Sequence, residues 1–74
     1  MNQHKMRAIL EFVRRQGPLP ADQFGQVLGT KELLEWFGLA GVLSSEERAC
    51  VGRELEMMRE AQAFVEQLQQ AMVS

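Results

Sequence analysis

Apolar side chains recur every three or four residues along most of this chain, and that spacing predicts helices and no strand. Near the start, one side of a helix is formed by Met6, Ile9, Leu10 and Val13. We expect this helix over about residues 3–16, because the Gly-Pro-Leu-Pro run at 17–20 favours a helix end.

Two short helices are expected next, over about residues 20–28 and 31–37. Pro20 suits the first turn of a helix, where its missing N–H costs nothing. Gly29 and Gly38 mark the ends of the two segments, since glycine is favoured just past a helix terminus. Each segment has an apolar side that can pack on the rest of the chain.

The last segment has the clearest pattern and predicts a long helix over about residues 44–73. Ser44 and Glu47 have the spacing of a capping box, in which each side chain satisfies a backbone N–H at the helix start. Gly52 weakens the second turn, and the pattern leaves open whether the helix continues through it. A seam of apolar residues follows at three- and four-residue spacing: Val51, Leu55, Met58, Val65, Leu68 and Met72. Three more widen it on one side: Cys50, Met57 and Phe64.

Such a helix is too long for the domain that a chain of 74 residues can build. At about 1.5 Å per residue it spans about 43 Å, whereas a compact domain of this size has a diameter of about 30 Å. The core is also small, and Cys50 and His4, the single residues of their types, offer neither a disulfide nor a familiar metal site. We therefore predict a homodimer. Its interface is expected to contain Val51, Leu55, Met58, Phe64, Val65, Leu68 and Met72.

The expected architecture is all-α, with three short helices and one long C-terminal helix in a single domain over residues 1–74. These helices are expected to form a small helical bundle that dimerises, and both parallel and antiparallel pairing remain open. The alternative is a helix that breaks near Gly52, or one that folds back as a closed monomeric bundle.

A second apolar group lies in the third short segment, where four large side chains fall within five positions: Leu33, Leu34, Trp36 and Phe37. On a helix they spread over too wide an arc for all of them to face one small core. We therefore predict that these residues bind another protein, with Trp36 as a main contact, because tryptophan is enriched among residues that carry binding energy. The alternative is that Trp36 closes the core against the long helix.

Catalysis needs a nucleophile, base or metal held close to a group that tunes it, and no such set can be drawn from this sequence. Cys50 falls inside an apolar arc, where an inert thiol is expected. We expect no enzyme activity, no cofactor and no metal site. The polar first residues and the lack of an apolar run of about 18 residues indicate a cytoplasmic protein without a membrane segment.

The charged residues are unevenly spread, although the net charge of the whole chain is only −2. Residues 1–20 are basic and residues 21–47 are acidic. This weak polarity does not predict a nucleic-acid function by itself. The candidate contacts to a nucleic-acid backbone are Arg7, Arg14 and Arg15.

Three elements follow one another in the first half of the chain: an apolar helix around residues 9–13, a Gly-containing turn at 17–20, and a segment at 21–29 that ends in Leu-Gly. In this order they resemble the opening of bacterial winged helix-turn-helix domains, over residues 6–43. The resemblance implies that the helix from Thr30 reads the DNA major groove. That helix departs from the pattern, because it carries two glutamates against one lysine and carboxylates repel phosphates.

The leading functional hypothesis is a small non-enzymatic regulator, either an inhibitor or an adaptor, that dimerises and binds a larger protein. By analogy of size alone, an accessory protein of a phage or mobile element fits this description. The first alternative is a helix-turn-helix-like DNA-binding transcriptional regulator with a dimerising C-terminal helix. The second alternative is a structural assembly subunit.

Overall fold

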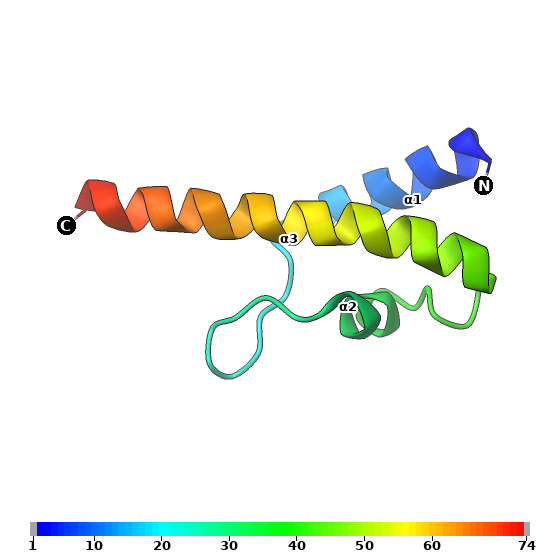
Figure 1. Ribbon diagram of the computed structural model, residues 1–74, viewed down its shortest axis with the longest axis horizontal. Coiled ribbons are helices and arrows are strands. Elements are labelled where there is room, and N and C mark those ends of the chain that lie inside the picture. The colour runs from blue at the N-terminus through cyan, green and yellow to red at the C-terminus, as the bar shows by residue number, and fades with distance from the viewer. Residues whose placement is uncertain (1, 74) are drawn as a thin grey trace.

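The computed structural model describes residues 2–73 and shows one long helix with two shorter helices packed on its first half (Figure 1). The helices are α1 (Gln3–Arg15), α2 (Thr30–Trp36) and α3 (Ser45–Val73). In the view of Figure 1, α1 and α2 lie on opposite sides of α3. No strand forms within residues 2–73, so the prediction of an all-α protein is confirmed.

Helix α1 begins and ends where its sequence provides the caps. The Asn2 side chain accepts a hydrogen bond from the backbone N–H of His4 (2.7 Å), which satisfies one of the free donors of the first turn. At the other end, Gly17 has a positive φ of 88°, a conformation that favours glycine and ends the helix. The helix therefore starts as expected and stops one residue before the expected end.

The helix expected over residues 20–28 does not form, and this expectation was wrong. The Asp22 carboxylate accepts hydrogen bonds from the backbone N–H groups of Phe24 (2.8 Å) and Gln26 (3.0 Å), so its side chain stabilises a turn in place of a helix. Gly25 has a φ of 81°, which is incompatible with a right-handed helix. The segment is a closed loop, and residues 2–73 contain three helices where four were expected.

This loop is tied to α3 by two side chains. The backbone N–H of Leu19 donates to Gln62 Oε1 (2.9 Å), and Gln62 Nε2 donates back to the Leu19 carbonyl (3.4 Å). Arg59 Nη2 donates to the carbonyl of Val27 (3.3 Å). Gln62 is therefore the last residue of α3 that these hydrogen bonds join to the loop.

The core lies between the first half of α3 and the elements on either side of it. Seven apolar residues form this core: Val13, Leu19, Leu33, Leu34, Leu43, Val51 and Leu55. Of the residues assigned to a dimer interface, Val51 and Leu55 are thus fully buried inside one chain, and Met58 packs against the same cluster. The prediction that these three residues form a dimer interface is therefore wrong for this fold, because they pack in the core of one chain.

Helix α3 is continuous through Gly52 and has 29 residues, so the open question of a break there is answered. The molecule measures 44 × 24 × 18 Å, and its Cα radius of gyration is 13.4 Å. A compact chain of this length has a radius of gyration of about 11 Å. The excess comes from the second half of α3, which stands clear of the other elements (Figure 1).

A hydrogen-bonded cap joins the starts of α1 and α3. Ser44 N donates to Glu47 Oε1 (2.9 Å) and Glu47 N donates to Ser44 Oγ (3.2 Å), which is the predicted capping box. The second oxygen of Glu47 accepts from Lys5 Nζ (2.6 Å). The Lys5 bond, followed by the bond from Ser44 N, holds the pKa of Glu47 below its ordinary value of 4.5.

We expect Glu47→Gln to lower the melting temperature at neutral pH, because the variant loses the charged acceptor for both partners. The folded-state pKa of Glu47 is lowered, so its stabilising effect is complete above about pH 5 and disappears as the pH falls through the folded-state value. The difference in melting temperature between parent and variant, measured by circular dichroism, should therefore shrink on acidification. Glu46→Gln is the control, since Glu46 lies in the same first turn. A pH-independent difference for Glu47→Gln would contradict this account.

Candidate interaction surface

Helix α3 has two apolar faces, and the rest of the chain covers only one of them. The covered face, here called the core face, consists of Val51, Leu55, Met58 and Gln62. The second face, here called the distal stripe, consists of Met57, Ala61, Phe64, Val65, Leu68 and Met72. All six residues of the distal stripe are exposed, with Met72 at 86% and Leu68 at 49% of their full accessible surface.

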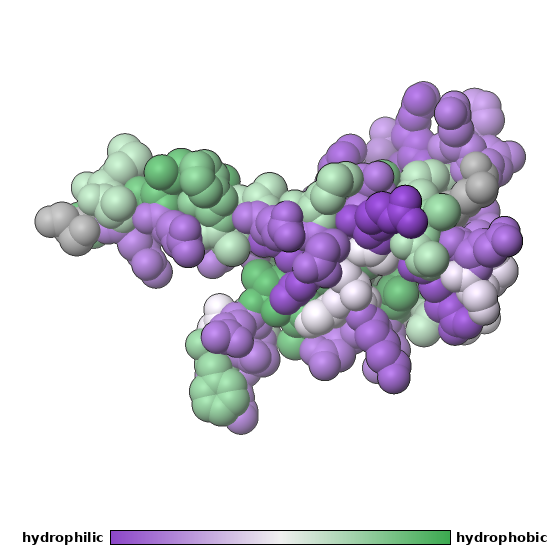
Figure 2. All heavy atoms as spheres, in the orientation of Figure 1, coloured by the Kyte–Doolittle hydropathy of each residue, from purple (hydrophilic) through white to green (hydrophobic). Residues whose placement is uncertain are grey.

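The distal stripe is not a continuation of the core face. With about 3.6 residues per turn, its centre lies roughly 100° around the helix axis from the centre of the core face. Figure 2 shows apolar residues gathered along one side of the part of α3 that stands clear of the body. The single seam expected from the sequence therefore divides into a core half and an exposed half. Of the predicted interface residues, Phe64, Val65, Leu68 and Met72 lie on the exposed half.

The apolar group of the third short segment is divided in the same way. Leu33 and Leu34 are buried in the core and are not accessible to a partner protein. Phe37 is half-buried and makes an edge-to-face contact with Phe12 at 6.2 Å between ring centroids. Trp36 points away from the core and keeps 66% of its surface exposed. The alternative in which Trp36 closes the core is therefore wrong for this fold.

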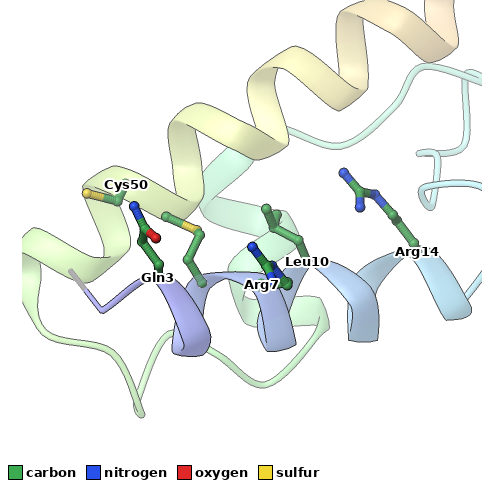
Figure 3. A pocket seen from close by; sticks show the side chains of 6 residues that line it. Gln3, Arg7, Leu10, Arg14 and Cys50 are labelled. Atoms are coloured by element: carbon green, nitrogen blue, oxygen red, sulfur yellow. The ribbon is translucent and has the colours of Figure 1, made fainter.

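An open groove of about 540 Å³ runs between α1 and α3 (Figure 3). The residues that line it are Gln3, Met6, Arg7, Leu10, Arg14 and Cys50. Cys50 precedes Met57 by seven residues, so the groove and the distal stripe lie on the same side of α3. Leu10, expected on the inner side of α1, is only half-buried and borders this groove.

The three arginines considered for nucleic-acid contact do not form one surface with a recognition helix. Arg7 and Arg14 line the groove, and Arg15 is exposed at the end of α1. A helix-turn-helix joins its two helices by a turn of about three or four residues, whereas residues 16–29 separate α1 from α2. The helix that the resemblance implied before Thr30 is absent, as described above.

The residues that the structure describes contain no group of three or more His, Cys, Asp or Glu side chains placed to hold a metal ion. Within residues 2–73, no helix has the length and apolar character needed to cross a membrane. No protein-family model, no curated protein and no solved structure matches this chain.

The positions of Leu33 and Trp36 predict opposite effects on stability. Leu33→Ala should lower the free energy of unfolding by about 2–5 kcal/mol, because it leaves a cavity in a fully buried site. Trp36→Ala should change it by no more than about 0.5 kcal/mol, since it removes an exposed side chain. Urea unfolding followed by circular dichroism measures both values. A loss of several kcal/mol for Trp36→Ala would show that this side chain is part of the core after all.

Proposed function

We propose that this protein is a non-enzymatic regulator or adaptor that associates with itself through the distal stripe of α3 and binds a second protein through the surface around Trp36. The observation that carries the proposal is the exposed row of large apolar side chains on a helix that extends beyond its own core. Contiguous apolar surface of this kind marks an interface in small proteins.

The spacing within the distal stripe supports a helix as the group that covers it. Met57, Ala61, Phe64 and Leu68 follow one another at alternating intervals of four, three and four residues. This is the heptad spacing that lets two helices pack side by side, each inserting side chains between those of the other. A second copy of the chain supplies such a helix without any further component.

The surface around Trp36 supports binding of a different protein. A tryptophan with most of its surface in water costs free energy in an isolated chain and contributes strongly when a partner covers it. Val42, at the turn after α2, is also exposed, six residues after Trp36 in the sequence. One face for self-association and another for a foreign partner suit an adaptor or an inhibitor.

We expect the protein to be a dimer at a concentration on the order of 10 µM and Leu68→Glu to be a monomer, because association would bury an unpaired carboxylate. Light scattering coupled to size exclusion gives the mass of both. Gln69→Glu is the matched control, since it adds the same charge one residue away and off the distal stripe. A monomeric parent protein would overturn the proposed self-association, and growth beyond a dimer would favour the structural assembly subunit.

The second part of the proposal is tested by affinity capture from the native host with the parent protein and Trp36→Ala. We expect a specific partner, identified by mass spectrometry, to be retained by the parent and lost with the variant. Val42→Ala should weaken the capture less, because it removes a smaller apolar surface. If Trp36→Ala stays folded and retains every partner of the parent, this surface is not the binding site.

A further inference from the structure

The groove between α1 and α3 has a position that suits the end of another helix. It lies beside the first half of α3, and the distal stripe continues from it along the second half. We propose that each copy of the chain places the second half of its α3 along the groove of the other copy, with the two α3 helices antiparallel. This inference rests on the proposed self-association and adds its direction and register.

The two flanks of the distal stripe differ in polarity, and this difference selects the antiparallel arrangement. One flank is apolar and repeats every seven residues: its first two residues, Val51 and Met58, pack in the core of their own chain, and its exposed part is Val65 and Met72. The opposite flank, at the same repeat, is polar: Arg53, Glu60 and Gln67. In two parallel helices each flank meets the opposite flank of the other helix, so apolar side chains would face charged ones. In two antiparallel helices like flanks meet, so the apolar flanks bury each other and the polar flanks stay in water.

The apolar flank is also the one that faces α1. Glu47, which binds Lys5 of α1, precedes Val51 by four residues and therefore lies on the same side of α3. In the antiparallel arrangement, Met72 of the second copy comes to lie between α3 and α1. Its exposed side chain then meets the half-buried Leu10 at the edge of the groove.

One register fits the sizes of the side chains. With Ala61 opposite Phe64 of the second copy, the smallest residue of the distal stripe faces its aromatic ring. The same register sets Met57 opposite Leu68, two flexible or branched side chains of similar volume. It is symmetric, so both copies use the same surfaces and the assembly closes as a dimer.

The charges of the groove match the helix end that it would receive. The last carbonyl groups of a helix carry a partial negative charge, and the last turn of α3 has no basic side chain to offset it. In the second copy this negative end reaches the groove, which Arg7 and Arg14 line. The attraction between this helix end and the two arginines adds to the apolar contact. It favours the antiparallel arrangement, because in a parallel dimer the two negative helix ends lie side by side.

The first test places a charge in the groove and leaves α3 unchanged. Leu10→Glu should raise the dissociation constant of the dimer by about tenfold or more, because it buries a carboxylate against Met72 of the second copy. Ala8→Glu is the matched control on the exposed side of α1 and should leave the dissociation constant unchanged. Sedimentation over a range of concentrations gives these constants, and circular dichroism on the same samples checks that each variant is folded.

The second test reads the direction of the helices and changes only one groove residue, Cys50, to a smaller apolar side chain. Spin labels on Arg53→Cys, in a Cys50→Ala background, would be separated by about 30 Å in the proposed antiparallel register. In a parallel dimer the two labels would lie within about 10–15 Å. Pulsed electron resonance distinguishes these distances even if Leu10→Glu fails to fold.

The outcomes separate this inference from the proposed function. A monomeric parent protein overturns both. A dimer that Leu68→Glu disrupts, but that gives the short label distance or tolerates Leu10→Glu, keeps the proposed self-association and overturns the antiparallel seating. A dimer with the long distance that Leu10→Glu weakens supports the inference.

Discussion

The packing of α1 and α2 on the first half of α3 is the interaction on which the rest of the structure depends. Both short helices make their helix contacts with α3, and the fully buried Leu55 of α3 belongs to the core that these contacts enclose. Helix α3 is thus the scaffold of the fold as well as its longest element. Because the body is so small, it covers the scaffold only as far as Gln62, where the loop between α1 and α2 is attached.

This arrangement has a consequence for the uncovered half of α3. An isolated helix of fewer than about 12–15 residues is marginal in water, because its first turn is costly to form. Residues 63–73 do not need to form that first turn, since they extend a helix that the core already holds. The distal stripe is therefore presented on a preformed surface, and association loses less conformational entropy than it would with a disordered segment.

The sequence predicted the all-α class and the long C-terminal helix, because these depend on local signals: the Ser44 and Glu47 capping box and a sustained three- and four-residue spacing. It failed where a side chain competes with the backbone. The Asp22 carboxylate and the positive φ of Gly25 make a loop of a segment whose apolar spacing suggested a helix.

The division of apolar residues between core and surface could not be predicted for a different reason. Two faces only about 100° apart on one helix merge into a single wide arc when they are read from spacing alone. Which half of that arc is covered depends on where α1 and α2 dock. The same holds for α2, where docking buries Leu33 and Leu34 and leaves Trp36 in solvent.

The distribution of polar residues along the second half of α3 indicates that the distal stripe has a role separate from the core face. If the core face is followed past Gln62, the next residues on that side are Glu66, Gln69 and Val73, so two of the three are polar, and Glu66 lines an open hollow with Gly25, Gln26 and Val27 of the loop. The distal stripe is exposed and yet stays apolar through Phe64, Leu68 and Met72. Solvation alone would favour polar residues on both sides. The second half of α3 is mainly polar on the side of the core face and apolar along the distal stripe. This pattern is suited to a second molecule that covers the distal stripe.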